Sequence, residues 1–214
     1  MRVLNLISGL ALAVLAAGCA APASQYYTLL PGASSAAGTA QSPYAAPGKF
    51  AISVQPVDLP QQVDRPQIVL SQPGSAQVQV LNGSLWAAPL ADEIRNSLAD
   101  DLSRQLGVLE LPVRAAPASL PLWVVNLAVQ RFDSVYNQQV ILEATWRLES
   151  RNPAGKSARV CRAAVRVPVQ PGMPALVAGH QEALHRLATI IAAQLSNRPV
   201  SGLKAEGIDL KGCT

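Results

Sequence analysis

The stretch "QVILEATWRLES", residues 139–150, alternates apolar and polar side chains more regularly than any other part of the chain. One face carries Val140, Leu142, Ala144, Trp146 and Leu148, and the opposite face carries Ile141, Glu143, Thr145, Arg147 and Glu149. Because successive side chains of a β-strand point to opposite faces, this alternation predicts a strand with one buried and one wetter face.

Two similar stretches flank this strand. "LWVVNLAVQRF" (122–132) comes before it and "SARVCRAAVRVPV" (157–169) after it, and both alternate in the same way. The connections "DSVYNQ" and "RNPAGK" are short and rich in turn-forming residues. Short connections join antiparallel neighbours, so the three stretches are predicted to form an antiparallel meander.

Two helices are predicted, one on each side of the meander in the sequence. In residues 85–108, leucine or isoleucine recurs every fourth position, and Pro89 and Gly107 suit the two helix ends. Residues 173–199 contain a second apolar stripe, which Pro199 ends. Such leucine stripes are typical of core-facing helices.

Shorter strands are predicted before the first helix. Residues 50–60 alternate, and residues 67–81, with two short apolar runs around Pro73-Gly74, predict a hairpin or two short strands. Residues 26–29 favour a short strand that pairs with the domain edge. The predicted fold class is therefore an α/β (α+β) sandwich: a mixed, largely antiparallel sheet with two main helices packed on it.

The N-terminus has the pattern of an exported leader. Arg2 is followed by an apolar run from Val3 to Ala17, which is too short for a confident membrane span. "AAGC" at 16–19 resembles the lipobox of bacterial lipoproteins, in which the cysteine is acylated and becomes the first residue. An ordinary secretory leader with a chance cysteine is the alternative. Ala20, rather than Asp, resembles the signal for sorting to the outer membrane.

These signals divide the chain into four parts. Residues 1–18 are predicted to be a lipoprotein signal peptide, and residues 19–48 to hold the lipidated Cys19, a short strand and a flexible linker. Residues 49–200 would form the folded domain, and residues 201–214 a C-terminal tail. The protein would then be anchored in the outer membrane by acylated Cys19 and would face the periplasm.

Two further cysteines remain for the folded part. In an oxidising periplasm, Cys161 and Cys213 are candidates for a disulfide that would attach the tail to the domain. Two free thiols with a disordered tail are the alternative.

No catalytic, metal or cofactor motif is evident, so the chain is expected not to be an enzyme. His180 and His185 lie about 140° apart around a helix, so they do not converge on a metal, and both are expected to face solvent. The net charge of +4, reduced to +3 once Arg2 is removed, comes without a basic run interleaved with aromatics. Nucleic-acid binding therefore has little support.

The stretch "PVDLPQQVDRPQIV" (56–69) is unusual because three prolines and three charges follow a strand. Proline restricts its own backbone and that of the preceding residue, so the stretch is predicted to be extended. A structural loop is one interpretation. The other is a partner contact, whose candidate residues are Asp58, Leu59, Pro60, Asp64, Arg65, Pro66, Gln67 and Ile68.

The chain also resembles a known family. The resemblance is carried by "YYTL" (26–29), "ISVQPVDLPQQVDRPQIV" (52–69), "LWAAPLADEIRNSLADDL" (85–102) and the last amphipathic helix. These features are similar to those of the ABC-type transport auxiliary lipoproteins, whose best-known branch is the PqiC group. The family often has an acidic residue where Ala88 stands, so a polar role is not carried over to that position.

The resemblance implies an α/β sandwich and a non-enzymatic outer-membrane lipoprotein. Its partner would be an MCE-domain (PqiB-like) protein that bridges the periplasm, in a system that moves lipids between membranes and supports envelope integrity. A homo-oligomer is compatible with such docking. Two alternatives stay open: a periplasmic lipid carrier with its own pocket, and a scaffold or activator lipoprotein of another envelope machine.

Overall fold

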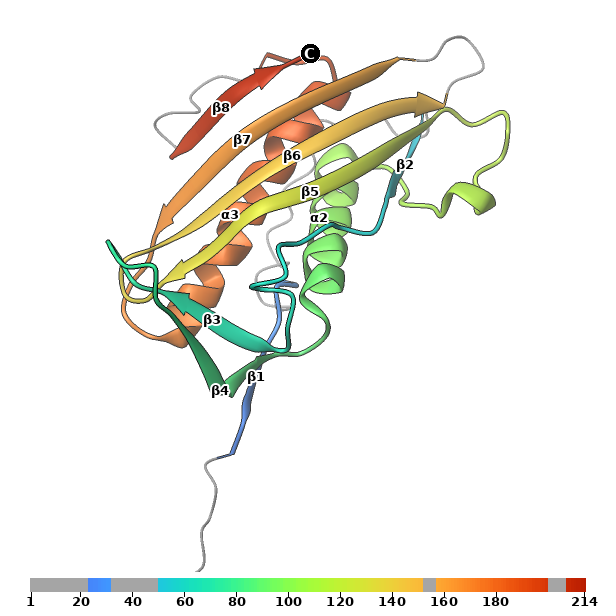
Figure 1. The fold of residues 1–214 in the computed structure, drawn as a ribbon. Helices are drawn as coiled ribbons and strands as arrows, with labels where there is room; N and C mark the ends of the chain where they lie inside the picture. The colour runs from blue at the N-terminus through green and yellow to red at the C-terminus, as the bar shows by residue number, and fades with distance from the viewer. Residues whose placement is uncertain (1–22, 32–49, 152–156, 200–206) are drawn as a thin grey trace, which may run out of the picture.

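In the computed structural model, the residues described are 23–31, 50–151, 157–199 and 207–214. They form one mixed sheet of eight strands, with two helices packed on one of its faces (Figure 1). The strands are β1 (Gln25–Tyr27), β2 (Ala51–Val54), β3 (Gln67–Ser71), β4 (Val78–Trp86), β5 (Leu122–Val135), β6 (Gln139–Arg151), β7 (Ala158–Pro168) and β8 (Ile208–Cys213). The helices are α2 (Leu90–Leu106) and α3 (Met173–Leu195), with a 3₁₀ turn, η1, at Val113–Ala115. The predicted fold class is confirmed.

The meander at the centre of the sheet is the one predicted from the alternating stretches. β5 pairs with β6 and β6 with β7, both antiparallel and both over almost the full length of the strands. The apolar face of β6 is buried, and the Trp146 side chain is 0% exposed beneath α3. Full burial of side chains of this size provides about 1.5–3 kcal/mol each, which makes this face the centre of the core.

The first helix also follows its sequence signals. Gly107 ends α2 in the left-handed conformation (φ 65°), and its backbone N–H donates to the Ser103 carbonyl at 2.9 Å. Pro89 lies just before the first helical residue. The apolar stripe is in the core at no more than 1% exposure, and its members are Leu90, Ile94, Leu98, Leu102 and Leu106. α2 packs against α3, so the two helices form one layer.

Segments near the chain termini pair with the strands at the two ends of the sheet. β1 pairs in parallel with the last three residues of β4, Ser84–Trp86, as an edge strand should. The predicted hairpin is formed by β3 and β4, which pair antiparallel. At the other edge, β8 pairs antiparallel with β7. The last described residues therefore belong to the sheet, although the sequence pattern predicts only a tail there.

Candidate functional site

The residues predicted to contact a partner form a loop with a fixed backbone, here called the 58–67 loop. The Val129 N–H of β5 donates to the Asp58 carbonyl at 2.9 Å, and the Asp58 N–H donates to the Leu127 carbonyl at 3.2 Å. Farther along, the Trp86 N–H donates to the Pro66 carbonyl at 2.8 Å. Val63 is 8% exposed and packs into the core. The loop is therefore attached to β5 and β4 and can present its outer side chains in a defined arrangement.

The structure separates the predicted contact residues into exposed and buried ones. The exposed members are polar or conformationally restricted: Asp58, Asp64, Arg65 and Pro66. Leu59, Pro60 and Gln67 are half-buried. The prediction is wrong for Ile68, which is 1% exposed, because it is the first core-facing residue of β3. Proximity in sequence does not show where a loop ends and a buried strand begins.

An open groove of about 460 Å³ lies where the end of β2 meets α2 and η1. Arg95 of α2 is held in this groove: its Nε donates to the Val54 carbonyl at 3.2 Å, and its guanidinium pairs with Glu110. Arg114 and Asp92 also line the groove. This groove could not be predicted from the sequence, because its walls come from three segments that are far apart in the chain.

A second groove, of about 330 Å³, lies between α2 and α3. Within it, Asp101 is 5% exposed. Its carboxylate accepts one hydrogen bond from Arg104 at 2.6 Å and lies 3.3 Å from Nδ1 of His185. The hydrogen bond to Asp101 raises the pKa of His185 above 6.5, and burial opposes this only in part. The Asp101 carboxylate therefore contacts two side chains: Arg104 of its own helix α2, and His185 of α3, whose charge depends on pH.

The segment after β1 covers one end of this second groove. The buried Glu93 carboxylate accepts hydrogen bonds from the Thr28 hydroxyl and the Leu29 N–H, both at 2.7 Å. Gln181 of α3 donates to the Thr28 carbonyl at 3.1 Å and to the Leu30 carbonyl at 3.2 Å. The Leu29 side chain is 0% exposed. The N-terminal segment is therefore attached to both helices.

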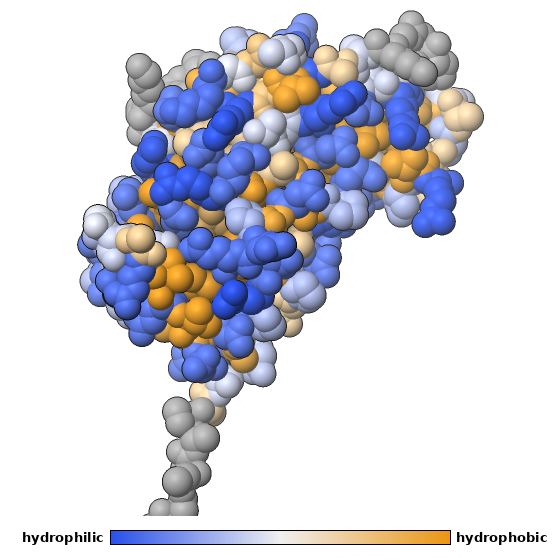
Figure 2. Space-filling model, viewed as in Figure 1, coloured by the Kyte–Doolittle hydropathy of each residue, from blue (hydrophilic) through white to orange (hydrophobic). Residues whose placement is uncertain are grey.

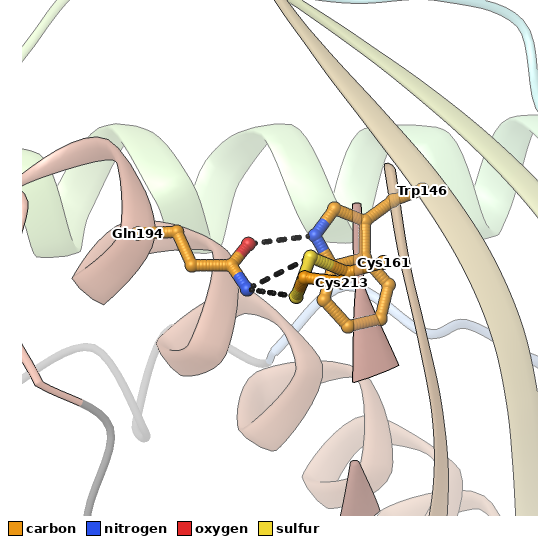
Figure 3. The surroundings of a disulfide bond; sticks show 4 residues. All are labelled: Trp146, Cys161, Gln194 and Cys213. Carbon is orange, nitrogen blue, oxygen red and sulfur yellow. Dashed lines mark hydrogen bonds between the residues drawn. A yellow bond between two sulfur atoms is a disulfide. The ribbon is translucent and has the colours of Figure 1, made fainter. Parts of the chain in front are cut away.

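A disulfide joins Cys161 of β7 to Cys213 of β8 (Figure 3). These are the two cysteines that the sequence made disulfide candidates. The Gln194 side chain of α3 lies beside it, and its amide Nε2 is 3.3 Å from the Cys161 sulfur and 3.5 Å from the Cys213 sulfur. The Gln194 Oε1 accepts a hydrogen bond from the Trp146 indole at 2.8 Å. The Gln194 amide therefore links α3 to Trp146 of β6 and to the disulfide between β7 and β8. Cys19, the predicted lipidation site, lies outside the described residues.

The two histidines occupy opposite environments. His185 is exposed, as predicted, but the same prediction is wrong for His180, which is 1% exposed. The His180 ring stacks on Phe132 with centroids 4.0 Å apart, and its Nε2 lies 2.8 Å from the Ser134 hydroxyl. Burial lowers the pKa of His180 to about 3, so the ring is neutral at neutral pH. The pair is part of the core, since Ser134 is also only 2% exposed.

The described part of the chain has neither a metal-binding cluster nor a membrane-spanning helix. No group of three or more His, Cys, Asp or Glu side chains there is placed to hold a metal ion. Neither of its helices combines the length and the apolar character that crossing a bilayer requires. The features that remain are exposed surfaces: the 58–67 loop, the two grooves and the sheet edges.

The fold and these surfaces define the chain as a small α+β sandwich domain with a rigid loop and open grooves. Residues 27–192 match the family model described as "ABC-type transport auxiliary lipoprotein component". The chain therefore belongs to this lipoprotein family. The match includes α2, most of α3, the meander and the 58–67 loop.

Part of the chain is also similar to individual proteins. The chain is 32% identical over 83 residues to proteins named "Intermembrane transport lipoprotein PqiC" from Escherichia coli K12 and Shigella flexneri. The match covers 37% of this chain and about two fifths (42%) of each relative. Among solved structures, one described only as an uncharacterized protein is similar with a TM-score of 0.59 and 20% identity, over 81% of this chain and 99% of that chain. This likeness supports the fold.

Proposed function

We propose that this protein is an outer-membrane-anchored, periplasm-facing lipoprotein subunit of an MCE-type system that moves lipids between membranes and supports envelope integrity. Membership of the transport auxiliary family supports the assignment to a transport system, and the relatives named PqiC are called intermembrane transport lipoproteins. Acylated Cys19 would provide the anchor. The protein would have no enzymatic activity of its own and would act by docking the MCE-domain partner.

The observation that carries the docking role is the 58–67 loop. Docking sites combine a fixed backbone with exposed polar and restricted side chains, because ordering them on binding then costs little conformational entropy. The loop has this combination: hydrogen bonds to β5 and β4 fix its ends, and Asp64, Arg65 and Pro66 are exposed. Two adjacent opposite charges can also set the orientation of a partner.

The core gives less support to the alternative of a lipid carrier. A carrier needs a cavity between the sheet and the helices, whereas here this space holds large side chains with less than 2% exposure, among them Trp146, Ile94, Leu98 and Leu142. Such packing is that of a core. Docking is therefore the function that these residues support best.

Co-purification tests the docking role directly. The tagged lipoprotein would be expressed with an MCE-domain (PqiB-like) protein of the same bacterium and extracted in a mild detergent. We expect the two to co-purify, and we expect the charge swap Asp64→Lys with Arg65→Glu to reduce recovery of the partner strongly. The matched control is the swap Arg147→Glu with Glu149→Arg on β6, which reverses an exposed ion pair and leaves the net charge unchanged. Equal loss in both variants, or no capture by the native protein, would contradict the proposal.

A further inference from the structure

In the part of the chain that the structure describes, the outer edge of β4 is unpaired over most of its length. β1 pairs only with Ser84–Trp86, and no strand within the described residues pairs with this edge between Val78 and Gly83. Val78 and Val80 are 38% and 36% exposed. Natural sheets protect such edges with charged side chains, proline or a covering segment, because unpaired N–H and C=O groups otherwise invite association. This edge therefore has the character of a contact surface.

The same edge carries no charge. Residues 66–91, which include β3, β4 and the turn between them, contain no Asp, Glu, Lys or Arg, and neither do residues 20–48. The neighbouring strands differ, since β5, β6 and β7 carry the exposed ion pairs Arg131–Asp133, Arg147–Glu149 and Arg162–Glu143. Figure 2 shows apolar surface gathered over β3 and β4. We call Tyr26, Val78, Val80 and the β4 backbone between Val78 and Gly83 the uncharged edge.

The position of the uncharged edge relative to the lipid anchor suggests which surface it contacts. Gln25, the first residue of β1, is only six residues after Cys19. A fully extended chain spans about 3.3–3.6 Å per residue, so this corner of the domain lies within about 20 Å of an acylated Cys19. Figure 1 places β1 and β4 together at one end of the molecule, with β2 and β8 toward the other.

We propose that the uncharged edge lies against the phospholipid headgroups of the membrane that holds the acyl chains. The proposal rests on the acylation of Cys19 put forward above and adds the orientation of the domain. Tyr26 is 67% exposed, and tyrosine favours the membrane interface, where its ring is partly withdrawn from water while its hydroxyl stays hydrated. Headgroups and their water can satisfy the unpaired backbone groups of β4. The absence of acidic side chains removes repulsion from anionic lipids.

Nitroxide quenching in vesicles tests this orientation. Acylation uses Cys19 and the disulfide uses Cys161 and Cys213, so an introduced cysteine is the single free thiol of the mature chain. The acylated Val80→Cys protein, labelled with an environment-sensitive fluorophore, would be reconstituted in phosphatidylethanolamine–phosphatidylglycerol vesicles containing a headgroup-region nitroxide lipid. The control is Leu109→Cys, which is 70% exposed and lies beside β2. Circular dichroism would verify that both variants are folded.

The expected result is several-fold stronger quenching, with a blue shift, for the label at Val80 than for the label at Leu109. Equal quenching at the two positions would overturn the proposal while leaving the anchor intact. A fluorescence change at Val80 that appears in detergent without lipid, and that grows with protein concentration, would overturn it in favour of strand pairing between two copies. Failure of the unlabelled mature protein to float with vesicles would instead defeat the anchor, and with it this proposal. As a second measurement, hydrogen exchange of Val78–Gly83 should be slower in vesicles than in detergent.

Discussion

Cys161 lies directly opposite Cys213 in the antiparallel register of β7 and β8, so the disulfide ties the last strand to the sheet. The bond closes a loop between residues 52 positions apart. A loop of this length corresponds to about 4 kcal/mol of unfolded-state entropy in the chain-entropy description. We expect the Cys213→Ser variant to unfold at a clearly lower denaturant concentration, measured by circular dichroism.

The matched control for this prediction is chemical reduction. Dithiothreitol should lower the stability of the native protein to nearly that of Cys213→Ser and should leave the variant itself unchanged. Hydrogen exchange should show the loss first in β8, because β7 is its one neighbour among the described strands of the sheet. Native stability that is insensitive to reduction would contradict a structural role of the bond.

His180 should make the protein sensitive to mild acid. Its folded-state pKa of about 3 lies below the ordinary value of 6.5, so under acid conditions the unfolded chain binds a proton that the folded protein does not. The stabilisation by neutral His180 is fully present above pH 6.5. It falls as the pH decreases toward 3, with a slope that approaches about 1.4 kcal/mol per pH unit. Urea unfolding of the native protein and of His180→Leu between pH 5 and 8 should show this slope only in the native protein.

His185 should make the stability depend on pH in the direction opposite to His180. Its pKa is raised above 6.5, mainly by the hydrogen bond to Asp101, so its stabilisation is present below pH 6.5 and is lost as the pH rises through the folded-state pKa. Because the side chain is about half exposed, the contribution should be small and should decrease in high salt. The His185→Gln variant should remove this component. A pH–stability curve of the variant that coincides with the native one at low salt would argue against the ion pair.

The N-terminal segment should depend on Glu93. This buried carboxylate is the acceptor for both Thr28 and Leu29, and its removal leaves a buried N–H without its partner, at a cost of about 1–3 kcal/mol. We expect Glu93→Ala to increase the rate at which proteases cut near residues 28–30. Asp92→Ala is the control, because it removes an exposed carboxylate from the same helical turn. Equal protease sensitivity in the two variants would contradict the role of Glu93.

The sheet and the helices could be predicted because their signals are local. The alternation around Trp146, the leucine stripe of α2 and Gly107 at its end each correspond to one feature of the structure. The C-terminal strand was not predictable in this way, because its place depends on pairing with β7 and on the bond to Cys161. An edge strand with few buried residues leaves only a weak sequence pattern.

The candidate surfaces, too, could be predicted only in part from the sequence. The exposed residues of the 58–67 loop could be selected from the prolines and charges, but the boundary at Ile68 could not, since burial depends on the neighbouring strands. The groove at Arg95 and the burial of His180 both need segments that meet only in the folded chain. The uncharged edge was not predicted from the sequence, because the structure was needed to show that no described strand pairs with β4 between Val78 and Gly83.

The close approach of α3 to the sheet should make Gly179 intolerant of a side chain. A Cβ atom at this position would overlap Cγ1 of Val169 and would lie 3.4 Å from Cγ1 of Val140. In an exposed helix, Gly→Ala stabilises by about 1 kcal/mol, whereas overpacking of a core costs about 1–3 kcal/mol. We expect Gly179→Ala to be destabilising on its own and neutral or stabilising in a Val169→Ala background, which creates the missing space. Urea unfolding of the four proteins in this double-mutant cycle measures the coupling. If Gly179→Ala changed the unfolding free energy equally in both backgrounds, contact with Val169 would not be the cause.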